Sequence, residues 1–394
     1  MRSHVLAHEK VGGTTTVGAF VDSGILMPMR ALVVVLVAGC SYTAPANVGS
    51  GPDSVDAAIA GDAIASSRVR ERLTVKTPPA TELVDFPVLV VLDSTRIDYT
   101  QAAPDGADLR FVDDNNTLLS HEIERWDPTG TSAIWVKVPR IPANTPSGFW
   151  MYFGDPDSVD GQNPSGVWTA GYRAVWHLSE NVADEGTTGS HVDSTGHANT
   201  GIQHGNAGVD ATGGIAGVQD FDGVDDGIEV SPTDLSITGS ELTIEVRALA
   251  RSGVNTWPHV IGAGSDGRYW QIWWDPGGQG WGNRFQVDGA KVENWTTTGP
   301  LNVWTTLASV YDGSAARLFI DGQPVSSAPG SGTLDALSTP LGIGMDPNLV
   351  PRNFDGLIDE VRISEVARSE AWLHAQHLSE TDALLEFGAP EMLP

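Results

Sequence analysis

Short apolar segments with alternating side chains, separated by turn residues, are the feature that most constrains the fold of this chain. In residues 134–138 (IWVKV), the aliphatic residues Ile134, Val136 and Val138 alternate with Trp135 and Lys137. This period of two is typical of a half-buried strand. Turn sequences such as 113–116 (DDNN) and 127–130 (DPTG) lie between such segments. The 45 glycines and 24 prolines among 394 residues suit many tight turns. Long helices are therefore largely excluded.

The expected strands fall into two groups. The first group comprises 86–93, 109–112, 118–126, 134–138 and 149–154, and the second comprises 227–230, 242–249, 269–274, 305–311, 316–320 and 356–363. A short helix is expected over 369–378, where Ser369 can cap the first turn and Glu370 suits the positive end of the helix dipole. We therefore predict an all-β chain of two antiparallel β-sandwich units, over 68–160 and 174–389, with one short C-terminal helix.

The amino-terminal segment has the pattern of an export signal. Residues 31–38 (ALVVVLVA) follow Arg30 and precede Gly39 and Cys40, and this apolar run is shorter than the roughly 20 residues that span a bilayer. The sequence 37–40 (VAGC) resembles the bacterial lipoprotein box, which implies cleavage before Cys40 and lipidation of its thiol. Residues 1–39 then comprise a signal peptide together with an N-terminal extension that lies upstream of the true start. Residues 40–67 form a disordered tether.

This resemblance implies a location in the cell envelope. Ser41 in the second mature position implies sorting to the outer membrane of a cell with two membranes. Because Cys40 is the only cysteine, no disulfide can form within the chain. We expect contact with the membrane through the lipid anchor only.

The net charge bears on the partners of the chain. Fifty acidic residues face 22 Lys and Arg, which gives a formal net charge of −28. A phosphate backbone would be repelled by this charge, so we exclude nucleic acid as a partner.

Two sets of segments resemble known families. Residues 174–178 (AVWHL), 221–226 (FDGVDD), 318–322 (LFIDG) and 354–363 (FDGLIDEVRI) resemble the bacterial laminin-G-like, concanavalin A-like jelly-roll family. Residues 107–111 (ADLRF), 121–126 (HEIERW), 134–139 (IWVKVP) and 151–154 (MYFG) resemble domain of unknown function 2341, which often precedes such jelly rolls. The resemblance implies a concanavalin A-like jelly roll for the second unit, and the first family implies no chemistry.

A cluster of carboxylates predicts a cation site. Asp220, Asp222, Asp225 and Asp226 lie within seven residues, and a turn that presents several oxygens suits calcium. In related jelly rolls, acids of the closing strand contribute, which implies Asp359 and Glu360 as further ligands. The alternative is a solvated acidic turn without an ion.

The densest aromatic region lies at 269–274 (YWQIWW). In a strand, Tyr269, Gln271 and Trp273 share one face, and the other face fills the core. We expect the first face to form an apolar platform for a sugar ring. The hydrogen-bonding side chains expected around that platform are Gln271, Arg268 and Asn283. The alternative is burial of both faces under loops.

No glycosidase acid motif is present. Glycosidases of this fold carry acids at alternating strand positions, whereas Thr243 separates Glu241 from Glu245 here, and Glu122 and Glu124 lie in the first unit. We therefore predict a lipid-anchored envelope protein without enzyme activity, whose jelly roll recognises a carbohydrate or a surface or extracellular partner. Two alternatives stay open: a polysaccharide-active hydrolase with an unrecognised acid pair, and a structural envelope component without a ligand.

Overall fold

The computed structural model describes residues 61, 63–155, 157–180, 190–205, 208–209, 214–232, 235, 237–251, 257–264, 269–275, 280–347 and 352–394. The chain divides into two compact units, 1–49 and 50–394, and all described residues belong to the second. The expected signal peptide, Cys40 and most of the expected tether lie outside the described residues. Within the described part, no helix is both long and apolar enough to cross a bilayer.

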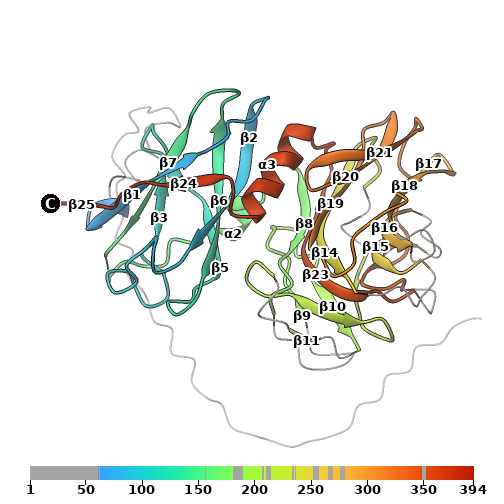
Figure 1. The fold of residues 1–394 in the computed structure, drawn as a ribbon, viewed down its shortest axis with the longest axis horizontal. Helices are drawn as coiled ribbons and strands as arrows, with labels where there is room; N and C mark the ends of the chain where they lie inside the picture. The colour runs from blue at the N-terminus through green and yellow to red at the C-terminus, as the bar shows by residue number, and fades with distance from the viewer. Residues whose placement is uncertain are drawn as a thin grey trace, which may run out of the picture. The chain divides into compact units, whose positions relative to one another are not determined.

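The first sandwich pairs a six-stranded antiparallel sheet with a three-stranded one (Figure 1). The six-stranded sheet contains β1 (Val69–Val75), β3 (Arg110–Val112), β4 (Leu118–Leu119), β7 (Gly148–Phe153), β24 (Leu385–Phe387) and β25 (Glu391–Met392). The three-stranded sheet contains β2 (Leu83–Leu92), β5 (His121–Arg125) and β6 (Ser132–Ile141). The short helix α2 (Pro164–Val167) follows, capped by the side chain of Asn163.

The second sandwich consists of two eight-stranded antiparallel sheets. The β16 sheet contains β9 (Ser190–His191), β10 (Gly201–His204), β13 (Gly227–Val230), β15 (His259–Ala263), β16 (Trp270–Asp275), β17 (Gly280–Val287), β18 (Ala290–Trp295) and β22 (Leu341–Ile343). The β23 sheet contains β8 (Tyr172–Trp176), β11 (Gly208–Val209), β12 (Gln219–Asp222), β14 (Leu242–Ala250), β19 (Thr305–Tyr311), β20 (Ala315–Ile320), β21 (Gln323–Pro329) and β23 (Asp355–Ser364).

The all-β prediction with one short C-terminal helix is confirmed. Helix α3 (Glu370–Glu380) begins after Ser369, whose side chain accepts a hydrogen bond from the backbone N–H of Trp372. The strands of the two groups lie within a few residues of the expected bounds, and β13 and β19 match them at both ends.

The carboxyl end of the chain differs from the expected organisation. Strands β24 and β25 pair with β1, so Leu385 lies opposite Val75 and Met392 opposite Val69. The six-stranded sheet of the first sandwich therefore contains residues that the expected boundary at 389 assigned to the second unit. Strand β1 was not among the expected strands, and neither were these partners.

Two hydrophobic cores hold the molecule together. One core lies between the β16 sheet and the β23 sheet and includes Trp270, Trp274 and Trp281. The other core fills the first sandwich and continues through α3 to the outer face of the β23 sheet, where it includes Ala308, Val310 and Phe319. The first sandwich and α3 therefore cover that face.

Candidate functional site

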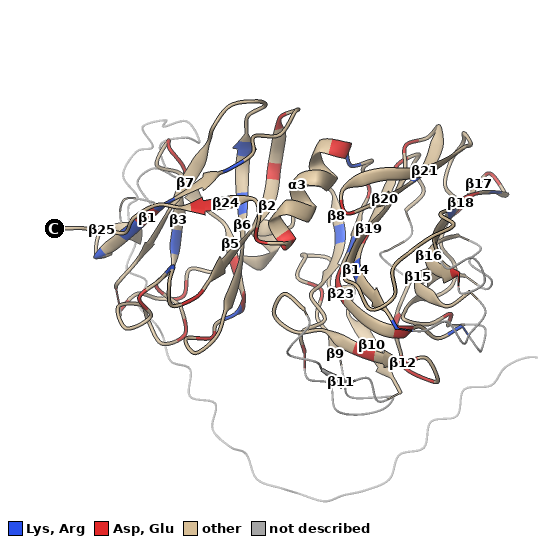
Figure 2. Cartoon of the chain, in the orientation of Figure 1, with Lys and Arg blue, Asp and Glu red and all other residues tan. Residues whose placement is uncertain are grey.

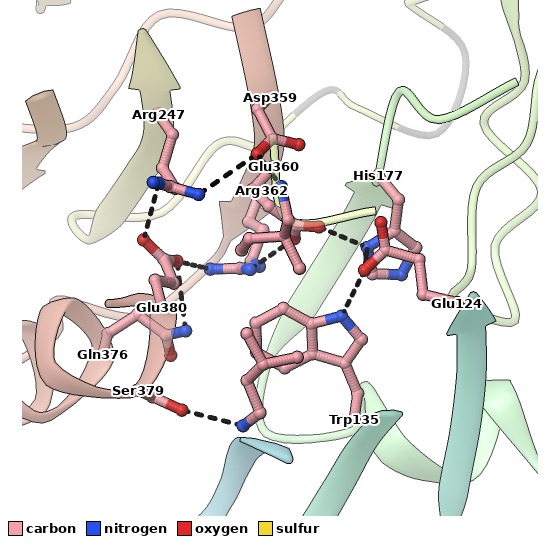
Figure 3. A network of polar contacts seen from close by, with 12 residues as sticks. Glu124, Trp135, His177, Arg247, Asp359, Glu360, Arg362, Gln376, Ser379 and Glu380 are labelled. Carbon is pink, nitrogen blue, oxygen red and sulfur yellow. Dashed lines mark hydrogen bonds and ion pairs between the residues drawn. The ribbon is translucent and has the colours of Figure 1, made fainter. Parts of the chain in front are cut away.

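The covered face of the β23 sheet carries a buried ion network, drawn in part in Figure 3. On β14, Ile244 and Val246 enter the core between the sheets, so Glu245 and Arg247 point the opposite way. The buried ion network comprises Glu122, Glu124, His177, Arg247, Asp359, Glu360, Arg362 and Glu380. These residues come from β5, β14, β23, α3 and the segment after β8.

A β-bulge in β23 gives this network its acidic pair. Ile358, Val361 and Ile363 all enter the core, which leaves two consecutive residues, Asp359 and Glu360, on the outer side. Glu360 has φ 52°, in the left-handed region that L-residues seldom adopt. The pairing register between β14 and β23 shifts at the same place.

His177 lies among three glutamates. Its Nδ1 is 2.8 Å from Glu360 Oε1 and 3.5 Å from Glu124 Oε2, and its Nε2 is 3.3 Å from Glu122 Oε2. Burial alone would lower the pKa of His177, but the three carboxylates, Glu360 foremost, raise it well above the usual value. The three carboxylates therefore favour the doubly protonated, charged imidazole over the neutral one.

Arg362 is the central cation of the network. Its guanidinium donates to Glu360 and to Glu380 and lies over the rings of Trp135 and Trp168 at 4.6 and 5.4 Å. Burial opposes the charge, but Glu360 and Glu380 raise the pKa of Arg362. The network thus joins the first sandwich, α3 and the β23 sheet through buried ion pairs.

The acid pairs considered for hydrolysis lie on or beside this covered face. Glu245 is 3% exposed, and Glu122 accepts hydrogen bonds from Trp168 Nε1 and Ser194 Oγ. Figure 2 shows that acidic residues otherwise lie on both sandwiches, in loops and in strands.

The outer face of the β16 sheet carries the predicted aromatic region. Trp270, Ile272 and Trp274 belong to the core between the sheets, so Gln271 and Trp273 point outward, as the alternation predicts. Trp273 is nevertheless only 1% exposed. A Cβ added at Gly282, its neighbour on β17, would overlap the Trp273 indole, so this ring occupies the space above the glycine.

The expected exposure of Trp273 is therefore wrong. Arg284 covers the ring at 5.5 Å and Trp257 lies beside it at 6.2 Å. Gln271 is buried as well. The Trp273 indole N–H and Gln271 Oε1 have no hydrogen-bond partner among the described residues.

Two other tryptophans on this face are open to solvent. Trp257 is 41% exposed and Trp295 is 52% exposed. Trp295 lies opposite Gly282, and Gly282 lies opposite Trp273, so these three positions form one row across β18, β17 and β16. The row ends on one side at the exposed Trp295 ring, and the exposed Trp257 ring lies beside its buried end at Trp273.

The remaining predicted ligand-binding residues lie elsewhere. Asn283 is on the opposite side of β17 from Trp273 and donates to Ser309 Oγ and the carbonyl of Arg317 inside the sandwich. The Tyr269 hydroxyl lies 2.6 Å from Ser338 Oγ, and the ring packs against the core. Arg268 lies outside the described residues. The structure thus corrects the grouping of Asn283 and Tyr269 with Trp273.

The six predicted metal ligands do not converge. Asp222, Asp225 and Asp226 bring one carboxylate oxygen each to within 4.8 Å of one another. Asp220 instead pairs with Arg251. Asp359 pairs with Arg247, and Glu360 pairs with Arg362 and His177. Asp359 and Glu360 therefore belong to the buried ion network, and a calcium site could draw on the three turn residues alone.

Two stretches of the chain match known families. Residues 222–374 match the concanavalin A-like lectin/glucanases superfamily. The chain carries a concanavalin A-like domain. Residues 105–178 match a domain of unknown function (DUF2341). No curated protein matches the chain.

Several solved structures resemble the chain. The receptor binding domain of botulinum neurotoxin C/D mosaic serotype aligns at 12% identity and TM-score 0.42, over 52% of this chain and 51% of its own. Domain 4 of AbnA, an extracellular arabinanase of Geobacillus stearothermophilus solved with arabinotriose, aligns at 18% identity and TM-score 0.39, over 52% and 96%. The binding domain of botulinum neurotoxin DC, solved with SialylT, aligns at 10% identity and TM-score 0.41, over 53% and 52%. The match thus spans about half the length of each neurotoxin chain.

Sequence reasoning missed Trp257 and the buried ion network. Trp257 lies in the loop just before β15, and its contact with Trp273 is a tertiary contact that the sequence does not mark. The network joins residues separated by up to 258 positions, from Glu122 to Glu380, and no local pattern of spacing marks such a set.

Proposed function

We propose that the concanavalin A-like domain binds a carbohydrate on the outer face of the β16 sheet, with Trp257 and Trp295 as the stacking surfaces. The row of exposed and buried tryptophans on this face is the observation that carries the proposal. Indole rings offer flat apolar faces of the kind that sugar C–H groups contact. The outer face of the other sheet is covered by the first sandwich, which favours the β16 sheet as the recognition surface.

The polar groups beside this row suit a hydroxylated ligand. The Trp273 indole N–H is a donor and Gln271 Oε1 an acceptor, and neither is satisfied within the described part of the chain. Arg284 donates to Glu293 Oε2 at 2.6 Å, so this pair presents charges next to the aromatic rings. Rings flanked by directional hydrogen-bonding groups are the usual composition of a glycan site.

A glycan array followed by calorimetry with the best-bound oligosaccharide tests this function. Trp295→Ala should weaken binding roughly 30-fold, since removal of a central aromatic contact costs ~2 kcal/mol or more. The melting temperature should stay unchanged because the ring is exposed. Trp304→Ala, on a partly buried ring that lies against Arg247 of the other sheet, is the control and should leave affinity unchanged. Absence of binding to any glycan would contradict the proposal. Binding by the Trp295→Ala and Trp257→Ala variants with the affinity of the wild type would contradict it as well.

We further propose that the protein acts without catalysis and is attached to the envelope, at the outer membrane, by lipid on Cys40. The lipoprotein-like sequence 37–40 supports the anchor. Metabolic labelling with a fatty acid should mark the wild-type protein and leave Cys40→Ser unlabelled. Hydrolysis of a polysaccharide by the purified protein would favour the alternative of a hydrolase. Ordered self-assembly on membranes without any ligand would favour a structural role.

Calcium at Asp222, Asp225 and Asp226 is a further part of the proposal. Oxygen donors on one turn suit this cation, at an extracellular-type affinity of about 10⁻⁴ to 10⁻³ M. Asp222 Oδ1 accepts a hydrogen bond from the backbone N–H of Val224, and Asp226 Oδ2 accepts one from that of Asp222, which fixes the turn. Addition of millimolar calcium should raise the melting temperature of wild type and leave Asp225→Asn unchanged. An identical melt of wild type with calcium and with chelator would count against the ion.

A further inference from the structure

We propose that Glu124, His177 and Glu360 bind one divalent transition-metal ion of the zinc class within the buried ion network. One ligand atom from each residue lies within 4.8 Å of the other two. His177 Nδ1 is 2.8 Å from Glu360 Oε1 and 3.5 Å from Glu124 Oε2. Two ligands that are each about 2.0–2.1 Å from a tetrahedral zinc ion lie roughly 3.3 Å apart. The 3.5 Å spacing lies close to that value, and the 2.8 Å spacing is shorter by about 0.5 Å.

Hydrogen bonding leaves one atom of this set, Glu124 Oε1, without a partner among the described residues. The single proton on His177 Nδ1 can go to one carboxylate, whereas two carboxylates face this atom. The Glu124 side chain is only 1% exposed, and its Oε1 has no hydrogen-bond partner among the described residues. A buried carboxylate oxygen without a partner is costly. A cation held between His177 Nδ1, Glu360 Oε1 and Glu124 Oε2 would contact both carboxylates at once.

The surrounding residues have the arrangement of an outer shell. His177 Nε2 faces Glu122 Oε2 at 3.3 Å, which is the geometry of a carboxylate that orients a metal-bound imidazole. Glu122 itself is held by Trp168 Nε1 at 2.6 Å and Ser194 Oγ at 2.7 Å. Trp135 Nε1 donates to Glu124 Oε2 at 2.8 Å. His177 and Glu124 are thereby each held by a second group, as Glu360 is by Arg362.

The charges and donor types favour zinc over calcium. Besides the two glutamate ligands, Glu122, Glu245, Asp359 and Glu380 are buried nearby, and Arg247, Arg362 and Arg368 are the guanidinium groups that face them. Carboxyl groups therefore outnumber guanidinium groups around the proposed ligands. One imidazole nitrogen with two carboxylates is a donor set that zinc accepts, whereas calcium takes six to eight oxygens.

Metal content of the refolded full chain tests this proposal. The protein is unfolded in denaturant with chelator, refolded with or without Zn²⁺, and desalted, and retained zinc is counted by elemental mass spectrometry. We expect one zinc per chain and a higher melting temperature after refolding with the ion. Glu124→Gln keeps the size of the side chain and should fold. It should lower zinc affinity by more than the ~10–100-fold typical of a change in the outer shell, which is the loss expected for Glu122→Gln.

Two further variants separate this site from surface binding. His177→Ala should abolish zinc retention, and circular dichroism reports whether it folds. His204→Ala, on a half-exposed histidine near Glu229, is the control and should retain zinc like the wild type. The proposal is overturned if the folded wild type retains no zinc, in which case the network is an ion-pair cluster only. It is equally overturned if Glu124→Gln retains zinc with wild-type affinity, because the ion is then bound elsewhere.

Discussion

Trp273 and Trp295 illustrate what a single residue contributes here. Both lie on the outer face of the β16 sheet, yet one is 1% and the other 52% exposed. Gly282 lies between them and has no side chain, so the Trp273 ring can pack over its backbone. The guanidinium of Arg284 covers the Trp273 ring. Strand alternation predicts on which face of the sheet a side chain lies. It does not predict whether neighbouring residues shield that side chain from solvent, as they shield Trp273 here.

Replacement of Trp273 should therefore affect stability. Trp273→Ala removes a buried indole and should lower the free energy of unfolding by roughly 3–5 kcal/mol, measured by urea unfolding. Trp295→Ala, on the exposed ring of the same row, should change it by less than about 0.5 kcal/mol. Equal effects of the two substitutions would contradict the burial described above.

Glu71 should make stability depend on pH. It lies buried on β1, its Oε2 has no hydrogen-bond partner among the described residues, and burial raises its pKa to about 7, against the opposing effect of Arg96. Between pH 4.5 and 7 the native state therefore holds a proton that the unfolded state releases. Stability should fall as pH rises through this window, by up to about 1.4 kcal/mol per unit.

Urea titrations at pH 5 and pH 8 measure this dependence. Glu71→Gln should reduce the difference between the two pH values and should be more stable than the wild type at pH 8. Glu386→Gln, an exposed position on the neighbouring strand β24, serves as the comparison and should keep the wild-type difference. A Glu71→Gln variant with an undiminished pH dependence would show that other groups cause it.

At the scale of elements, helix α3 and the bulged strand β23 bring together the residues of the buried ion network. The bulge turns Asp359 and Glu360 to one side, and α3 brings Glu380 to Arg362. Helix α3 also covers the open edge of β2, because the backbone N–H of Leu89 donates to Ser379 Oγ at 2.7 Å. The helix itself was predicted from its cap, but its packing partner was not.

Loss of the Ser379 hydroxyl tests the role of α3 at that edge. Ser379→Ala leaves the buried N–H of Leu89 without this acceptor and should lower the free energy of unfolding by about 1–3 kcal/mol. Thr381→Ala at the exposed end of the same helix should have a smaller effect. Denaturant unfolding of both variants supplies the measurement, and a neutral Ser379→Ala would argue that water replaces the hydroxyl.

At the scale of the whole molecule, two features join the sandwiches: the hydrophobic core of the first sandwich, which extends onto the β23 sheet, and the buried ion network. The core of the first sandwich includes residues of α3 and of the β23 sheet, and the end of the chain returns to β1. We therefore expect residues 68–392 to unfold in one cooperative transition, with tryptophan fluorescence and circular dichroism changing together. Two separated transitions would contradict this expectation.

Arg362 should contribute strongly to the free energy of unfolding of this cooperative unit. Arg362→Ala leaves Glu360 and Glu380 buried without their guanidinium and should lower the free energy of unfolding by about 3–5 kcal/mol. Arg140→Ala removes an exposed pair with Glu82 and should change it by about 0–1 kcal/mol. Thermal or urea melts compare the two, and similar losses would mean that the buried charges are not coupled.

The sequence by itself determined the all-β class, most strand positions, the helix and its cap, and the two family resemblances. These follow from local periodicity and turn chemistry, which act over a few residues. Only the tertiary structure decided that Trp273 is covered, that Asn283 points inward, that Glu360 joins His177, and that β24 returns to β1. Each of these depends on contacts between distant segments, where packing and burial, not spacing along the chain, choose the neighbours.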